Sequence, residues 1–266
     1  MASQLIANYY DQIPPLPVDV PSDEFRQMRT EMERYAIEQW PILPGVTMET
    51  VSFDGTKAIW YRPPDARSDQ VILYIHGGGF MWCSAEGHQG VISRVAAATG
   101  CPALAIDYEV APFARFPSQI DECARGYNWL LDQGYPAGKI AIVGDSAGGG
   151  LVLSTIVALK RDNVPLPGCI CVSSSWADLT NSGESIDWVT TDPCVSREGL
   201  EFCRQQYLQG HDPKDPLASP LLADVHGFPP SLVQVAARER LLSDSIRYAS
   251  KADAAGVEVK LEVYDG

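Results

Sequence analysis

The chain has 266 residues, 45% of them hydrophobic, so it can bury a sizeable core and form one domain, or one domain with a cap. It carries 34 acidic and 20 basic residues, a net charge of −14, without a basic cluster. This balance excludes nucleic acid and anionic membrane surfaces as expected partners. The N-terminus has neither a basic nor an apolar stretch, so we expect no signal peptide, no membrane span and a cytoplasmic protein.

The cysteines indicate neither a metal site nor a disulfide framework, because their number is odd and they form no Cys-x-x-Cys pair. Cys169 and Cys171 lie two residues apart in an apolar run, so they share one face of a predicted strand. We expect both to be core cysteines in a reducing compartment. The chain has seven cysteines: Cys83, Cys101, Cys123, Cys169, Cys171, Cys194 and Cys203.

Residues 1–44 are expected to form a separate N-terminal segment. Within it, Gln4 to Gln12 predicts a short helix, and Ile13 to Pro21, with four prolines, predicts an extended stretch. Ser22 then begins a longer helix, whose acidic first turn favours the helix dipole. An apolar stripe at helical spacing predicts that this helix packs onto the main domain; its members are Phe25, Met28, Met32 and Tyr35.

After residue 45, a hairpin and then alternating strands and helices are predicted. Val46 to Phe53 and Thr56 to Tyr61 flank the turn signal Asp54-Gly55. The alternation that follows predicts an α/β fold, with a mostly parallel sheet of eight strands and helices on both faces. Residues 176–218 interrupt it and are expected to cover the strand ends, where ligands bind in such sheets. The further strands are expected at 71–75, 103–107, 139–143, 168–173, 231–237 and 257–264, and the helices at 90–99, 117–132, 147–160 and 244–255.

The stretch Gly144-Asp145-Ser146-Ala147-Gly148 lies between an apolar strand and a helix rich in Ala, Leu and Val. Gly-x-Ser-x-Gly at such a junction is typical of a nucleophile elbow, a turn too tight for side chains at its flanking positions. The turn presents the Ser146 hydroxyl at a helix N-terminus, where backbone N–H groups and the helix dipole favour negative charge. Ser146 is therefore the predicted nucleophile, and Asp145 is expected to brace the turn.

A second glycine-rich stretch, His76-Gly77-Gly78-Gly79-Phe80, follows another apolar strand. Three consecutive glycines let the backbone turn its N–H groups inward, as an oxyanion hole requires. In lipases and esterases the His-Gly-Gly-Gly motif supplies this loop, and the residue after the nucleophile adds a further N–H. Gly77, Gly78 and Ala147 are therefore the candidate oxyanion donors.

With both motifs, the chain resembles the hormone-sensitive-lipase branch of the α/β-hydrolases, in its small esterase form. The resemblance extends from about Gly45 to Gly266 and implies the α/β-hydrolase fold with a helical cap, formed by residues 1–44 and 176–218. Where the family usually reads Asp-Tyr-Arg-Leu-Ala-Pro-Glu, Glu109 and Phe113 replace the Arg and the Glu. This change is expected to alter a loop near the site and to leave catalysis untouched. Shorter matching motifs are Asp107-Tyr108, Ala111-Pro112, Phe116-Pro117 and Ser219-Pro220-Leu221-Leu222.

The acid of a Ser-His-acid triad is expected just past strand 231–237, where both Glu239 and Asp244 are candidates. The resemblance favours Glu239, because family members usually carry this acid ten residues before the second residue of a Tyr-Ala or Leu-Ala pair, here Ala249. Asp244 then falls at the start of the next helix, where an acidic residue is routine. The alternative assignment to Asp244 stays open.

The catalytic histidine itself is not present in this chain. The family carries it on the loop after the last strand, here 257–264, followed by a final helix. We therefore expect a C-terminally truncated esterase that is a poor catalyst as written. Its last strand would lack a cover, which predicts aggregation or a homodimer with a second copy of the chain. The four histidines are His76, His88, His211 and His226, of which only His226 is considered as a substitute base, from the wrong end of the sheet.

The resemblance implies a carboxylic-ester hydrolase that acts on short-chain esters through an acyl-Ser146 intermediate, with no metal and no cofactor. Lactones and acetylated natural products are alternative substrates. A different class stays open: an inactive, receptor-like homologue that binds a ligand, as in a plant hormone receptor similar to this family. Phe80 and Trp82, directly after the oxyanion loop, either line the substrate pocket or belong to the core.

Overall fold

The computed structural model describes residues 20–265. The predicted helix Gln4 to Gln12, and nearly all of the predicted extended stretch Ile13 to Pro21, lie outside the described residues. Within these residues no helix is long and apolar enough to cross a bilayer.

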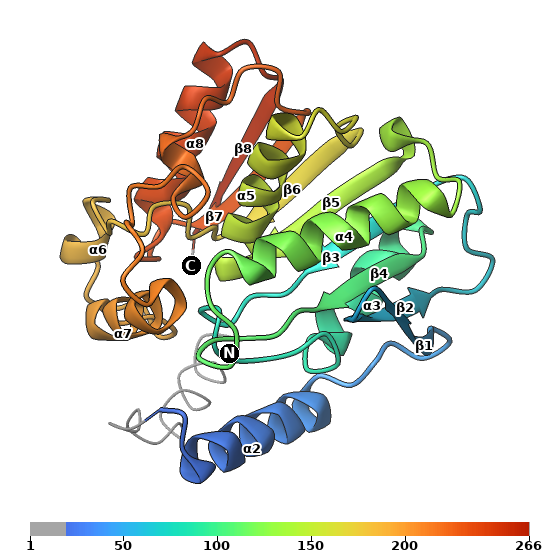
Figure 1. The fold of residues 1–266 in the computed structure, drawn as a ribbon, viewed down its shortest axis with the longest axis horizontal. Coiled ribbons are helices and arrows are strands. Elements are labelled where there is room, and N and C mark those ends of the chain that lie inside the picture. Colours follow the sequence, from blue (N-terminus) through green and yellow to red (C-terminus); the bar gives the residue numbers. More distant parts are fainter. Residues whose placement is uncertain (1–19, 266) are drawn as a thin grey trace.

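Eight strands form one sheet in the order β1-β2-β4-β3-β5-β6-β7-β8 (Figure 1). β1 and β2 form the predicted hairpin, β2 runs antiparallel to β4, and the strands from β4 to β8 in this order pair in parallel. The prediction of a mostly parallel sheet of eight strands is confirmed. The strands are β1 (Thr47–Phe53), β2 (Thr56–Arg62), β3 (Val71–Ile75), β4 (Ala103–Asp107), β5 (Ile140–Asp145), β6 (Cys169–Ser173), β7 (Ser231–Ala236) and β8 (Val259–Tyr264).

The helices cover both faces of the sheet, but unequally. α4, α5 and α8 pack on one face, where Leu73 and Ile142 are buried, and α3 packs on the other, against β2 and β4. β3 is buried at all five positions because it lies between these two layers, which explains its uninterrupted apolar run. The helices are α2 (Asp23–Gln39), α3 (Gln89–Thr99), α4 (Ser118–Asp132), α5 (Ala147–Arg161), α6 (Ser185–Trp188), α7 (Arg197–Leu208) and α8 (Leu242–Ala254), with short 3-10 turns η1 (Ala137–Lys139) and η2 (Pro220–Leu222).

The predicted helix after Ser22 is α2, and the Ser22 hydroxyl accepts a hydrogen bond from the Phe25 N–H at 3.1 Å. Phe25 is fully buried, with its ring 4.9 Å from the ring of Trp82 and 6.2 Å from that of Phe113. Helix α2 therefore docks against the loop that follows β3, as the apolar stripe predicted.

The segment 176–218 contains α6 and α7, which lie together on the side of the molecule away from β1 and β2 (Figure 1). Phe80 stacks on Tyr207 of α7 with 3.9 Å between ring centroids. A side-chain carbon added to Gly79 would approach the Cys203 sulfur to 2.9 Å, so α7 lies directly against the glycine-rich loop. These contacts bring α7 to the end of β3 that carries the motif.

The interpretation of Cys169 and Cys171 as core cysteines is wrong. Cys169 is exposed and Cys171 is half-buried, whereas their neighbours Ile170 and Val172 are buried. The two cysteines face the side of the sheet on which α3 packs, and α3 packs mainly against β2 and β4, which lie away from β6 in the strand order. All seven cysteines are free thiols.

Candidate active site

Ser146 is held at the junction between β5 and α5 in a backbone conformation that favours glycine. Its φ is 52° and its ψ is −123°, an unusual combination for a residue with a side chain. Its N–H donates to the Ser173 carbonyl at 2.8 Å, and its carbonyl accepts from the N–H groups of Gly150 and Trp176. The end of β6 thus holds the turn in place, while the Ser146 side chain stays half-exposed.

The elbow and the oxyanion loop are packed so closely that only glycine fits between them. A side-chain carbon added to Gly148 would lie 2.2 Å from the Ile75 carbonyl oxygen, and one added to Gly77 would lie 2.4 Å from a carboxylate oxygen of Asp145. Both distances are far below van der Waals contact. The two motifs, about seventy residues apart in the sequence, therefore form one unit.

Three backbone N–H groups around Ser146 have no hydrogen-bond acceptor among residues 20–265: those of Gly77, Gly78 and Ala147. Gly78 has a φ of +106°, and its carbonyl accepts from Met81 and Trp82 in a tight turn. Ala147 begins α5, where the first N–H groups have no partner within the helix. Unsatisfied donors of this kind are what an oxyanion hole offers to a carbonyl oxygen.

Asp145 stabilises the elbow through the hydrogen bonds of its carboxylate. One carboxylate oxygen accepts the Tyr74 hydroxyl at 2.9 Å, and the other lies 3.4 Å from Nε2 of His88. Burial acts to raise the pKa of Asp145, but the His88 charge and hydrogen bond outweigh it and lower the pKa. The carboxylate is committed to these partners, which fits the predicted bracing function.

His76 is the first residue of the oxyanion loop, and its side chain is buried next to that loop. Its ring stacks on Tyr108 at 4.1 Å, and its Nδ1 donates to the Gly77 carbonyl at 2.7 Å. Burial, followed by the nearby His88, lowers the pKa of His76 to about 4, so the ring is neutral at pH 7. His76 supports the shape of the loop and makes no hydrogen bond to Ser146.

Glu239 lies just after β7, beside the strand end that holds Ser146. Its Oε1 accepts from the Ala236 N–H at 3.0 Å, and its carboxylate also accepts from Ser174. Burial raises the pKa of Glu239, although Ser174 opposes the shift. Since Ser173 and Ser174 are adjacent, Glu239 is connected to Ser146 through the end of β6.

Asp244, the alternative acid, has a different environment in the first turn of α8. It is 1% exposed, and its Oδ2 accepts from the N–H groups of Ala177 and Asp178, both at 2.9 Å. Burial and then the neighbouring Asp178 raise the pKa of Asp244 to about 7. Its hydrogen bonds fasten the chain that follows β6, which favours a structural function and leaves Glu239 as the better candidate.

The other two histidines lie away from the elbow. His211 packs edge-on against Phe116 at 5.3 Å, and His226 is exposed, with its Nδ1 2.7 Å from a carboxylate oxygen of Asp224. The His226 carbonyl accepts from Lys160 near the C-terminal end of α5, the opposite end from Ser146. No histidine of the described chain forms a hydrogen bond with the Ser146 hydroxyl.

Phe80 and Trp82 occupy different environments. Phe80 is 2% exposed and belongs to the core between the oxyanion loop and Tyr207. Trp82 is half-buried, between Phe25 of α2 and the oxyanion loop. This geometry favours core packing for Phe80 and a wall of the site for Trp82.

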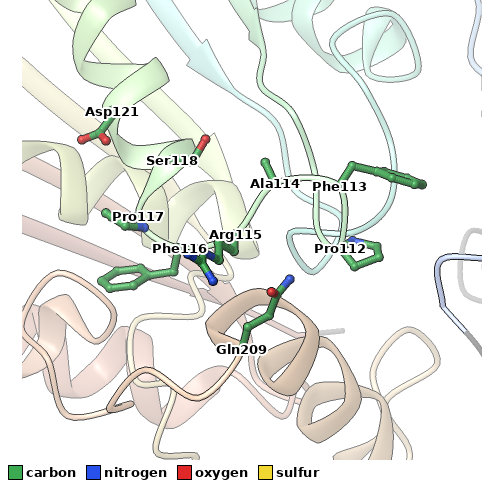
Figure 2. A pocket seen from close by; sticks show the side chains of 9 residues that line it. All are labelled: Pro112, Phe113, Ala114, Arg115, Phe116, Pro117, Ser118, Asp121 and Gln209. Carbon is green, nitrogen blue, oxygen red and sulfur yellow. The ribbon is translucent and has the colours of Figure 1, made fainter.

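Sequence reasoning missed two arginines of α2 that stand over Phe113. The guanidinium carbons of Arg26 and Arg29 lie 4.0 and 5.6 Å from the centre of its ring. A hollow of about 500 Å³ lies along the loop from Pro112 to Ser118, with Gln209 beyond the end of α7 reaching toward it (Figure 2). The arginines are some eighty residues away from Phe113 in the sequence, so no local pattern could have indicated the contact.

The sheet has eight strands and is mostly parallel, and a strained serine lies between a strand and a helix, beside backbone N–H groups without acceptors. This combination defines a serine hydrolase of the α/β type. Residues 72–266 match the family model described as the alpha/beta hydrolase fold. The chain belongs to this family, and within it to the hormone-sensitive-lipase group. In the described chain no cluster of three or more His, Cys, Asp or Glu residues is arranged to hold a metal ion.

Relatives and solved structures agree with this assignment. An acetyl-hydrolase of Streptomyces hygroscopicus is 34% identical over 241 residues, which cover 90% of this chain and 79% of that protein. An esterase of Acinetobacter venetianus is 36% identical over 85% of this chain and 75% of its own length. The crystal structure of an esterase from the bacterial hormone-sensitive lipase family superposes with a TM-score of 0.92, at 38% identity, over 99% of this chain and 87% of that one.

Proposed function

We propose that the chain is a carboxylic-ester hydrolase for short-chain esters, with Ser146 as its nucleophile. The observation that carries the proposal is the position of Ser146, half-exposed at the start of α5, beside the unsatisfied N–H groups of Gly77, Gly78 and Ala147. The relatives that are acetyl-hydrolases and esterases support this substrate class. Seven free thiols suit a reducing compartment, so we place the enzyme in the cytoplasm.

The reaction follows from the geometry. The Ser146 oxygen attacks the ester carbonyl carbon and gives its proton to a base, while the carbonyl oxygen becomes an anion held by the three N–H groups. The ester C–O bond then breaks, and the alcohol leaves with that proton. Water attacks the acyl-serine in the same way, which releases the acid and restores the hydroxyl. Glu239 would orient an imidazole base and stabilise its charged form.

The base is none of the four histidines, given their contacts in the structure. Without a base about 3 Å from its hydroxyl, Ser146 stays a protonated alcohol, and the remaining catalysis over water is about 10³- to 10⁴-fold. The 266-residue chain is therefore expected to hydrolyse esters slowly. Added imidazole, a freely diffusing base, is expected to raise the rate in a saturable manner.

The decisive experiment measures hydrolysis of nitrophenyl acetate, butyrate and dodecanoate by the 266-residue chain, with and without imidazole. Ser146→Ala should reduce the rate to that of imidazole alone, without a change in circular dichroism. The control His226→Asn should leave both rates unchanged. An unaffected rate in Ser146→Ala would refute the nucleophile, and a preference for dodecanoate would refute the short-chain class.

A receptor-like, inactive binding protein is the second candidate, and one observation favours it: no histidine of the described chain forms a hydrogen bond with Ser146. Added imidazole distinguishes the two functions, because it should raise the rate of turnover of an enzyme that lacks only its base. A pocket that only binds carboxylates would show saturable binding of acetate or butyrate and no imidazole-dependent turnover.

A further inference from the structure

A carboxylate lies against the oxyanion loop, beside the place where negative charge develops on the substrate. A side-chain carbon added to Gly77 would lie 2.4 Å from Oδ2 of Asp145, so this oxygen is in contact with a residue that offers a candidate oxyanion N–H. An uncompensated carboxylate there repels the anion that forms on the ester carbonyl, because like charges at such short range disfavour each other. The oxyanion hole therefore needs a positive charge that offsets Asp145.

His88 is the side chain placed to supply that charge. Its Nε2 lies 3.4 Å from the same Oδ2 of Asp145 that contacts Gly77. The backbone carbonyl of Ser84 also accepts a hydrogen bond from its ring. A neutral imidazole has one N–H donor, whereas the imidazolium ion has two. Because the ring faces two acceptors, on Asp145 and on Ser84, the geometry favours the protonated form of His88.

The other two titratable groups beside this pair are neutral. Tyr74 donates to Oδ1 of Asp145 at 2.9 Å, and burial raises the pKa of Tyr74 well above its ordinary value, so the hydroxyl keeps its proton. The ring of His76 lies 5.4 Å from that of His88, and burial lowers the pKa of His76 to about 4. Among residues 20–265 no lysine or arginine forms an ion pair with Asp145. His88 is therefore the cation that contacts this carboxylate.

His88 changes its charge near neutral pH. Burial acts to lower the pKa of His88, but the charge and the hydrogen bond of Asp145 outweigh burial and raise the pKa above 6.5. The rings packed around it belong to Tyr74, 6.5 Å away, and to His76, and both are uncharged at pH 7. The positive charge is thus present at low and neutral pH and is lost as the pH rises through the raised pKa.

We propose that protonated His88 is a positioning residue of the reaction: it neutralises Asp145 beside Gly77, so that the oxyanion hole stabilises the anion formed from the ester. His88 acts through Asp145 and does not touch the substrate. The repulsion exists only when the carbonyl oxygen carries negative charge, so loss of the His88 charge should lower kcat and leave KM nearly unchanged. The inference rests on the proposed esterase function and adds the residue on which its oxyanion hole depends.

The test removes the charge of His88 and then the charge that it offsets. Hydrolysis of nitrophenyl acetate with imidazole is measured for the unmodified chain, His88→Gln and the double variant His88→Gln/Asp145→Asn. His88→Gln keeps a hydrogen-bond donor but leaves Asp145 charged, so kcat should fall about tenfold, less than the roughly 100-fold loss of a whole oxyanion donor. The double variant contains neither charge, and its kcat should recover to within about threefold of the unmodified chain.

The matched control is His226→Gln, which removes another histidine–aspartate pair. Nδ1 of His226 lies 2.7 Å from the carboxylate of Asp224, and the pair is exposed at the other end of α5 from Ser146. His226→Gln should change neither kcat nor KM. Circular dichroism checks the fold of each variant, and His88→Asn replaces His88→Gln if the latter does not fold.

Binding of butaneboronic acid tests the same charge without turnover, because its adduct with Ser146 is a tetrahedral anion. Its affinity should fall about tenfold in His88→Gln and recover in the double variant. The ratio of the affinities of the unmodified chain and the double variant should decrease from about pH 6 to about pH 9, because only the unmodified chain has a proton on His88 to lose.

A double variant as slow as His88→Gln, or slower, would refute the proposal, because removing a carboxylate does not rescue a merely structural histidine. Equal affinity of the unmodified chain and His88→Gln for the boronic acid, including no binding by either, would refute it as well. So would an affinity ratio that does not change with pH. If nitrophenyl acetate is not hydrolysed at all, the esterase function fails, whereas the boronic acid affinities still support or refute the charge of His88.

Discussion

Glu239 and Asp244 follow the same strand by a few residues, yet their carboxylates have different partners. Glu239 accepts from Ser174 and Ala236 at the strand ends beside Ser146, whereas Asp244 holds two N–H groups inside the protein. We propose that Glu239 stabilises an imidazolium ion at Ser146, so Glu239→Gln should lower the imidazole-assisted rate at least about tenfold. The exposed control Glu258→Gln should not change it. A larger kinetic loss in Asp244→Asn than in Glu239→Gln would reverse the assignment.

The raised pKa of Asp244 predicts how stability depends on pH. Burial, and then the charge of Asp178, which Arg247 partly neutralises, raise its pKa from 3.8 to about 7. The folded protein therefore holds this proton more tightly than the unfolded chain does. The stabilisation is fully present below about pH 4 and is lost as the pH rises to about 7, by up to about 1.4 kcal/mol per pH unit.

Asp244→Asn, a neutral isostere, should remove that dependence. Urea unfolding of both chains at pH 5 and pH 7.5 measures it: the unmodified chain should lose stability relative to Asp244→Asn as the pH rises. The same slope in both chains would mean that Asp244 ionises normally in the folded protein.

At the scale of elements, α2 belongs to the N-terminal segment and packs against residues beside the site. Its attachment depends on Phe25, which is fully buried against Trp82 and Phe113. We propose that residues 1–44 act as a cap. Its described helix, α2, is anchored at Phe25 and also through Glu33, which accepts from the Ser84 hydroxyl. The segment 176–218 would complete the cap, since α7 packs on the oxyanion loop through Tyr207.

Phe25→Ala should detach α2 without unfolding the sheet, because deleting a buried phenylalanine costs about 3–5 kcal/mol and here affects a peripheral helix. Hydrogen exchange of residues 23–39 should become faster, with the strands β3 to β7 unchanged. Gln27→Ala, on the exposed side of the same helix, is the control. Uniformly faster exchange over the whole chain would show that α2 belongs to the main folding unit.

At the scale of the whole molecule, β8 forms one edge of the sheet among the described residues. Leu261, Val263 and Tyr264 on this strand are 38%, 49% and 51% exposed. An edge strand with exposed apolar side chains is a template for pairing with another chain. The 266-residue chain should therefore self-associate as its concentration rises.

Val263→Lys places a charge on that edge and should shift the chain toward monomer in sedimentation velocity measurements. Val91→Lys, on an exposed position of α3, provides a matched control. Association that is unchanged in Val263→Lys would exclude β8 as the contact surface.

The sequence by itself determined the order of the elements and the chemistry of the elbow, for a local reason. Buried strands such as Val71–Ile75 show as apolar runs, and the glycines of the elbow and the oxyanion loop stand in short, recognisable motifs. Ser146, Gly77 and Gly78 could therefore be selected as candidates from short motifs. These signals lie within a few residues of one another, and no partner elsewhere in the chain is needed to recognise them.

Tertiary structure alone decided what depends on distant neighbours. The exposure of Cys169 depends on which part of the sheet α3 covers, and an apolar strand pattern does not contain that information. The preference for Glu239 over Asp244 gains its structural support from partners on another segment, at the end of β6. The pairing of Arg29 with Phe113 joins a helix and a loop that only folding brings together, because side chains acquire burial and charge environments from packing and not from their sequence neighbours.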